Sequence, residues 1–211
     1  MELITTHTIA EGKDMAENLH LAVEKLRTWL DTHPRCHDEY HHWFGQGGIA
    51  SAIECFVKRV QPEYWTDENV SDLLLVLHQS PTEHIAELIM CNESMALAIA
   101  RHSIGCSGLA SDEIALWLGR CVNHREEAEE LLIKFTQHSH ERTRRIALLS
   151  LAKLQSASVE PLALAAWDTG EQYAQMGTLA ALDTIGSPLF SVYLRRALGI
   201  LRTSSGYAKI A

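Results

Sequence analysis

The stretch Arg145-Ile146-Ala147-Leu148-Leu149-Ser150-Leu151-Ala152-Lys153-Leu154 decides the fold, because a related stretch, Met176-Gly177-Thr178-Leu179-Ala180-Ala181-Leu182-Asp183-Thr184-Ile185-Gly186, follows it 31 positions later. The aligned pairs are Leu148/Leu179, Ser150/Ala181, Leu151/Leu182 and Leu154/Ile185. A period of this size is typical of stacked helical hairpins, in which no unit buries its apolar face alone. Such arrays usually serve as binding surfaces, so the repeat favours a binding protein over an enzyme.

Helical periodicity runs through almost the whole chain, and no segment shows the sustained alternation of a strand. The predicted helices cover about 13–31, a stretch from near His37, and then 49–60, 67–78, 81–90, 93–102, 112–121, 125–137, 140–154, 158–167, 170–185 and 188–202. We therefore predict one all-α domain over 1–211. It would comprise irregular helical pairs in 1–110, regular hairpins in 111–202 and a frayed tail in 203–211.

Short polar residues mark the expected helix starts. The strongest signal is Ser80-Pro81-Thr82-Glu83, in which serine caps, proline takes the first turn and glutamate reaches back to the cap. Gly186-Ser187-Pro188 combines a stop, a cap and a first-turn proline in the same way. The other predicted capping residues are Thr66, Asn123, Ser139 and Ser158.

The pattern Arg-x-Ala-x-x-small-Leu-x-x-Leu at 145–154, with small-Leu-x-x-Ile-Gly at 181–186, resembles the HEAT repeat of the HEAT/armadillo-like superfamily. The resemblance covers about 111–202 and implies a right-handed α-solenoid, here of about five hairpins. The sequence departs from the pattern at Gly177, where a repeat usually carries a side chain. It also lacks the usual Asp followed by Val between the two helices of a hairpin.

Charge is unevenly distributed along the chain. The net charge is −9 over 211 residues. Residues 1–139 hold 10 Lys/Arg against 22 Asp/Glu, whereas residues 140–211 hold 8 against 5. The overall negative charge disfavours nucleic-acid binding, which gains affinity by neutralising phosphates, and favours a basic partner. No apolar run could span a membrane and no secretory signal opens the chain, so we expect a cytoplasmic protein.

Candidate metal and catalytic motifs are incomplete. His33, His37 and His41 recur every four residues, but Pro34 follows His33 where a zinc helix would carry glutamate, so a polar helix start is favoured over a metal site. Iron-dependent deoxyhypusine hydroxylases, a HEAT family, use several His-Glu pairs to bind a di-iron centre, but this chain offers only His140-Glu141, which cannot supply enough ligands, so this activity is disfavoured. We predict no cofactor, no catalytic residue and no disulfide framework. Cys55, Cys91 and Cys121 are expected to be small buried hydrophobes.

Acidic residues are the candidate binding set. If 81–90 and 125–137 are second helices of hairpins, their carboxylates could line a negatively charged groove. The predicted partner-binding residues are Asp67, Asp72, Glu83, Glu87, Glu126 and Glu130. Tyr64, Trp65 and Trp117 are candidate apolar anchors, with a core role favoured for Trp117.

Together these features predict a non-enzymatic protein-binding module. The most specific hypothesis is a bacterial immunity protein that occludes a basic, nuclease-type toxin domain. One alternative is an enzyme with a HEAT-like fold, either a DNA glycosylase or a bilin lyase, and another is a general scaffold. Arg142, Arg144, Arg145, Arg195 and Arg196 would contact DNA in the glycosylase alternative, although solvated helix faces explain them better.

Overall fold

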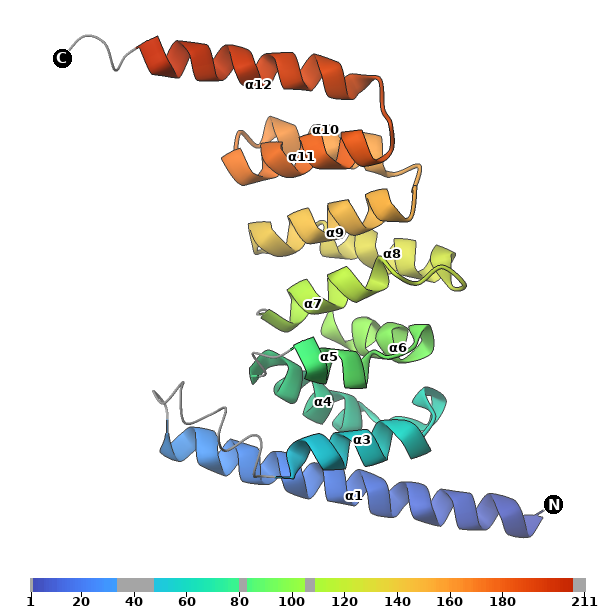
Figure 1. The fold of residues 1–211 in the computed structure, drawn as a ribbon. Helices are drawn as coiled ribbons and strands as arrows, with labels where there is room; N and C mark the ends of the chain where they lie inside the picture. The colour runs from blue at the N-terminus through green and yellow to red at the C-terminus, as the bar shows by residue number, and fades with distance from the viewer. Residues whose placement is uncertain (1, 34–47, 80–82, 105–108, 207–211) are drawn as a thin grey trace. The chain divides into compact units, whose positions relative to one another are not determined.

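The computed structural model describes residues 2–33, 48–79, 83–104 and 109–206, and all regular structure in these ranges is helical (Figure 1). The all-α prediction is therefore confirmed for this part of the chain. The elements are α1 Glu2–Thr32, α3 Ile49–Arg59, the 3-10 helix η1 Pro62–Tyr64, α4 Asp67–Gln79, α5 Glu83–Ile89, α6 Glu93–Ser103, α7 Leu109–Leu118, α8 Arg125–Phe135, α9 Glu141–Lys153, α10 Val159–Asp168, α11 Gln172–Thr184 and α12 Leu189–Gly206.

Most predicted helices lie where the sequence placed them, but both terminal helices are longer. α1 begins at Glu2 rather than near residue 13, and α12 continues to Gly206, into the tail that we expected to fray. The helix expected near His37 and the cap at Ser80-Pro81-Thr82 lie outside the described residues. None of the described helices combines the length and apolarity needed to cross a membrane.

The predicted capping residue is confirmed at α4 and wrong at α8 and α9. Thr66 caps α4 as predicted, because its Oγ1 accepts from the Asn69 N–H at 3.2 Å while Asn69 Oδ1 accepts from the Thr66 N–H at 3.1 Å. Ser139 does not cap α9. His140 holds the cap position, and its N–H donates to His138 Nδ1 at 3.2 Å. His124 likewise replaces Asn123 as the N-cap of α8.

The chain divides into two compact units, Met1–Ile114 and Ala115–Ala211. In the first unit α1 packs against α3 and α4, α4 packs against α5 and α6, and α3 contacts α5. The core of this unit is built from helix stripes such as Leu19, Val23 and Leu26 of α1, all fully buried. These residues recur at three- and four-residue steps, the spacing of one face of a helix.

A buried carboxylate joins α1 to α4. The side chain of Asp72 is 1% exposed, accepts from Arg27 Nη2 at 3.0 Å and lies 2.9 Å from His20 Nδ1. The hydrogen bond to Asp72 raises the pKa of His20, with burial opposing it and the charges of Asp72, Glu68 and Glu24 assisting. Burial raises the pKa of Asp72, although His20 and Arg27 oppose that rise. An ionised carboxylate is tolerated here because the Arg27 guanidinium and the His20 ring both bond to it.

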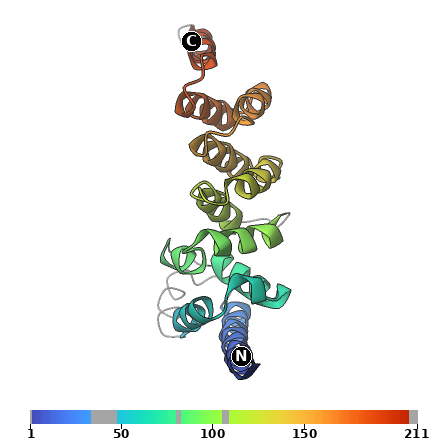
Figure 2. The same ribbon diagram turned by 90° about the vertical axis from the view of Figure 1, so that its right-hand side faces the viewer.

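In the second unit α9 packs against both α8 and α11, and α10 packs against α11 and α9. α9 and α11 form one layer, while α8 and α10 lie on the other side of them, as Figure 2 shows. Small side chains bring the layers together. Ala147, Ser150, Thr178 and Ala181 are each 0–1% exposed, and we call these four residues the small-residue seam. Such side chains allow helices to approach closely.

The 31-residue period reappears in three dimensions at the ends of α9 and α11. Both helices end on a residue with positive φ, 55° at Gln155 and 67° at Gly186. The following serine N–H then donates to a carbonyl of the last turn, from Ser156 to Leu151 O at 3.1 Å and from Ser187 to Leu182 O at 2.9 Å. This is the hydrogen-bond pattern of a left-handed helix C-terminus.

The same two serines bind a carboxylate of the preceding helix in the other layer. Ser156 Oγ donates to Glu129 Oε2 at 2.8 Å, and Ser187 Oγ donates to Glu160 Oε1. Each hydroxyl also accepts a backbone N–H two residues later, from Ser158 and from Leu189, both at 3.2 Å. Every partner in the second set is displaced by 31 positions from its counterpart, so the sequence repeat is also a repeat of hydrogen bonds.

The closest helix approach predicts opposite effects of two alanine substitutions. A Cβ on Gly119 would lie 2.7 Å from Ser150 Cβ and 3.0 Å from Ser150 Cα, so Gly119→Ala should lower the free energy of unfolding by about 1–3 kcal/mol. Ser150 Oγ is buried without a hydrogen-bond partner among the described residues. Ser150→Ala should therefore be neutral or stabilising by about 1 kcal/mol. Urea denaturation of both variants checks this, and equal effects would contradict the packing described.

The contact between α1 and α4 predicts a pH effect. A histidine with a raised pKa stabilises the folded chain below its unfolded pKa, near 6.5, and this contribution is lost as pH rises through the folded value. The urea midpoint of the first unit should therefore be higher at pH 6 than at pH 8, and His20→Gln should reduce the difference. His78→Gln on the exposed side of α4 is the control and should retain it.

Candidate protein-binding surfaces

The two predicted acidic residues of α8 lie on its outer side. The inner side of α8 is fixed by Ala128, Leu131, Leu132 and Phe135, which are 0–4% exposed. Glu126 and Glu130, one turn apart, are exposed and form no hydrogen bond or ion pair with a described residue. They are therefore held on a rigid helix with their carboxylates uncommitted.

Glu129, on the same helix, has a different role. Its Oε1 accepts from Arg125 Nε at 2.6 Å and its Oε2 accepts from Ser156 Oγ. Burial opposes ionisation of Glu129, but the hydrogen bonds from Arg125 and Ser156 outweigh it, so the pKa of Glu129 lies below its usual value. The carboxylates of α8 therefore divide into an internal contact at Glu129 and an external pair at Glu126 and Glu130.

The predicted acidic residues of the first unit are not equivalent to one another. Asp67 is exposed, with its Oδ1 2.9 Å from His102 Nε2, and Glu87 is exposed without a partner among the described residues. Glu83 opens α5, and its side chain lies outside the description. Asp72 does not belong to an accessible set, because it is buried against His20 and Arg27. Helical periodicity misplaced it, since it takes account of local spacing and not of partners 45 and 52 residues away.

The predicted set is therefore divided by the fold. Asp67, Glu83 and Glu87 belong to the first unit, whereas Glu126 and Glu130 belong to the second. Within the second unit the Glu126/Glu130 pair is the one site at which the structure brings predicted residues together. A groove that combines the two groups stays a prediction.

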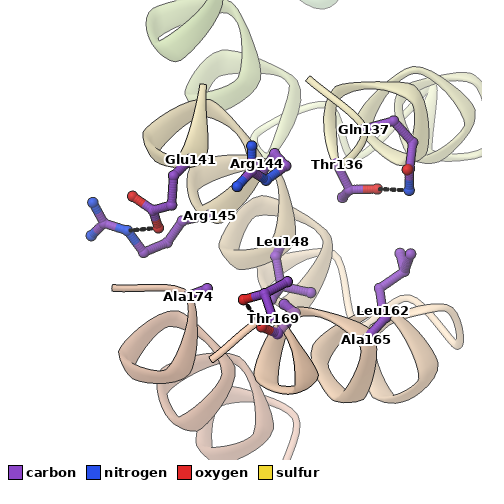
Figure 3. A pocket seen from close by; sticks show the side chains of 11 residues that line it. Thr136, Gln137, Glu141, Arg144, Arg145, Leu148, Leu162, Ala165, Thr169 and Ala174 are labelled. Atoms are coloured by element: carbon purple, nitrogen blue, oxygen red, sulfur yellow. Dashed lines mark hydrogen bonds and ion pairs between the residues drawn. The ribbon is translucent and has the colours of Figure 1, made fainter. Parts of the chain in front are cut away.

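A pocket of about 260 Å³ lies in the second unit, between the end of α8, the start of α9, the end of α10 and the start of α11 (Figure 3). Its floor is apolar, made by Leu148, Leu162, Ala165, Ala166 and Ala174. Its polar lining is Thr136, Gln137, Thr169, Glu141, Arg144 and Arg145. The volume is below the range of about 300–1,000 Å³ that is usual for small-molecule sites.

Internal bonds occupy much of this polar lining. Arg144 Nη1 donates to the carbonyls of His138 and Ser139 at 3.1 and 2.9 Å, and Arg144 Nη2 donates to Glu171 at 2.9 Å. Thr169 Oγ1 donates to the Ala166 carbonyl at 2.8 Å. Arg144 therefore holds the α8–α9 loop against the start of α11. It offers little to a phosphate or a substrate.

Arg145 differs from its neighbour Arg144, although the sequence placed both in one basic group. In Figure 3 its guanidinium points away from the other lining residues and bonds to Glu141, at an Nε–Oε1 distance of 3.0 Å. It also lies over the exposed ring of Tyr173, 5.5 Å from the centroid. The sequence signal that could have revealed this cluster is Gly177, the departure from the repeat pattern.

The other candidates fall into anchors and metal-ligating residues. Tyr64 is 71% exposed. Trp65 is half-buried, donates from Nε1 to the Val60 carbonyl at 2.9 Å and lies against Phe56. Trp117 is also half-buried, beneath the Arg120 guanidinium. The described residues contain no cluster of three potential metal ligands.

The predictions for the histidines and the cysteines are confirmed only in part by the described residues. His33 stacks on Trp29, whereas His37 and His41 lie outside the described residues. Cys121 is buried as predicted, but Cys55 and Cys91 are exposed. The periodicity of α3 placed Cys55 beside its apolar stripe, and the side chain lies on the solvent side of that edge.

Comparisons of the chain with protein-family models, with curated proteins and with solved structures gave no match. The function is therefore argued from the chain's own residues.

Proposed function

We propose that this chain is a non-enzymatic protein-binding module, and most specifically an immunity protein that binds and occludes a basic, nuclease-type toxin domain. The observation that carries the proposal is the pair Glu126 and Glu130. These carboxylates are exposed and uncommitted on a helix whose opposite side is packed into the core. Neighbouring carboxylates are used internally, which makes this pair stand out from the general negative charge.

The proposed mechanism is occlusion. A nuclease binds phosphates with Lys and Arg side chains, and carboxylates spaced along a helix can occupy the same cationic groups. The two like charges one turn apart cost about a few tenths of a kcal/mol in the free protein. A cationic partner removes that repulsion. The negative charge of residues 1–139 would also accelerate encounter with a basic domain.

We further propose that the helical hairpins stack as a right-handed HEAT-like solenoid. The support is the 31-residue repetition of helix ends, serine hydroxyls and bound carboxylates in α8–α12. In such an array the helices of one layer offer a continuous surface to a partner. A rigid surface loses little conformational entropy when a partner binds, which suits a tight inhibitor.

Charge reversal of the α8 pair tests the proposal. Tagged protein is used to capture partners from cells that produce it, with elution in a salt gradient. We expect a stoichiometric basic protein whose nuclease activity is blocked by the chain. The double variant Glu126→Lys/Glu130→Lys should weaken that complex by about 100-fold or more, since close interfacial charge pairs couple by about 1.5 kcal/mol or more each.

Asp168→Lys/Asp183→Lys is the matched control, because it makes the same change in net charge at exposed positions on α10 and α11. It should reduce affinity far less. If the control weakens the complex as much as the α8 variant does, the effect is one of net charge and the α8 surface is wrong. Capture of DNA or of a coloured tetrapyrrole in place of a basic protein would favour the enzyme alternative.

A further inference from the structure

Three contacts hold the side chain of Arg145 in one place on the layer formed by α9 and α11. Its Nε donates to Glu141 Oε1 at 3.0 Å, its guanidinium carbon lies 5.5 Å from the centroid of the Tyr173 ring, and its stem crosses Gly177. An arginine fixed in this way has lost most of its rotamer freedom before any ligand arrives. Binding to it therefore costs less entropy than binding to a mobile arginine.

Gly177 is the feature that makes this arrangement possible. A Cβ at position 177 would lie 2.7 Å from Arg145 Cγ and 2.9 Å from Arg145 Cδ. The equivalent position in α9, 31 residues earlier, is Ile146. The second copy of the repeat therefore has no side chain at the position of α11 that the Arg145 stem crosses. Glycine stands there even though it weakens a helix interior by about 0.5–1 kcal/mol.

The two Nη atoms of Arg145 are available to a ligand. Neither Nη atom of Arg145 hydrogen-bonds to a described residue, and the side chain is 29% exposed. Tyr173 and Met176, on the same side of α11, are 60% and 56% exposed. Arg142, one turn before Arg145 on α9, is also exposed. The positive charge of Arg145 therefore stays accessible at its Nη end.

We propose that Arg145, Tyr173 and Met176 form a docking site for an acidic segment of a partner protein. A carboxylate of that segment binds both Nη atoms of Arg145 end-on, and its apolar neighbours cover Tyr173 and Met176. Two parallel N–H···O bonds are the preferred geometry between arginine and carboxylate. Exposed tyrosine, methionine and arginine are also the residues enriched at protein interfaces.

Other arginines of the same unit lack this combination. The Nη atoms of Arg144 donate to two backbone carbonyls and to Glu171. Arg196 stacks on Tyr193 at 4.8 Å, as Arg145 does on Tyr173, and has no ion pair with a described carboxylate. Gly199, three residues after Arg196 on α12, has no neighbouring side chain within 4 Å of its Cβ position. Arg196 is therefore a matched control. It stacks on a tyrosine ring as Arg145 does, but it has neither a glycine beneath its stem nor a carboxylate that holds its guanidinium.

This site is distinct from the acidic pair of α8, because it lies on the layer of α9 and α11 and attracts the opposite charge. The two proposals can fail separately. Charge reversal at Glu126 and Glu130 tests one of them, and neutralisation of Arg145 tests the other.

The test uses two fluorescein-labelled 12-residue peptides, one with a central Leu-Glu-Glu-Leu and its twin with Leu-Gln-Gln-Leu, in anisotropy titrations at low salt. We expect the acidic peptide to bind at least ten-fold more tightly than its twin. Arg145→Gln should abolish that preference. Gly177→Ala should weaken it several-fold by displacing the arginine stem, while circular dichroism shows an intact helical fold. Arg196→Gln should leave it unchanged.

Several outcomes would overturn the proposal. They are equal affinity for the two peptides, absence of binding to the acidic one, or an effect of Arg196→Gln as large as that of Arg145→Gln. A 20-nucleotide single strand that binds through Arg145, without discrimination between the peptides, would make this a phosphate-binding surface instead. A dimer in light scattering that dissociates in Arg145→Gln would assign the site to a second copy of the chain.

Discussion

The second unit depends on the close contact of its helices at the small-residue seam of Ala147, Ser150, Thr178 and Ala181. Because these side chains are short, the helices approach closely, and a Cβ on Gly119 would lie only 2.7 Å from Ser150 Cβ. Thr178 Oγ1 can then donate to the Ala163 carbonyl at 2.8 Å, in the middle of the buried contact with α10. α9 and α11 also approach closely at Gly177, where a Cβ would lie 2.7 Å from Arg145 Cγ, and this proximity confines the arginine stem.

Carboxylates in this protein serve two purposes that composition alone does not separate. Glu129 and Glu160 accept from serine hydroxyls of the next hairpin, and Glu141 and Glu171 hold arginines. Asp72 is buried against Arg27 and His20. Fewer carboxylates are therefore available to a partner than the net charge of −9 suggests. The surface of interest is therefore defined by the acids that the fold leaves uncommitted.

The sequence predicted the helices well and the tertiary partners poorly. Periodicity and capping residues located nearly every described helix, and Thr66 with Asn69 shows why: a cap is a contact between near neighbours. Asp72 was misplaced because its partners come from α1, far away in the chain. The sequence named Arg145 within a basic group but did not predict its contacts with Glu141, Tyr173 and Gly177, because two of these residues lie on another helix. The solenoid, the partner and the immunity role stay predictions.

The repeated hydrogen bond between serine and glutamate has a consequence for how such a chain can change in length. Ser156 and Ser187 each bind a glutamate 27 positions earlier, on the preceding helix of the other layer. A chain that gains or loses one 31-residue segment here therefore keeps a serine opposite a glutamate at the new junction. This joint is interchangeable, so the length of the surface can evolve by duplication before any side chain on that surface changes.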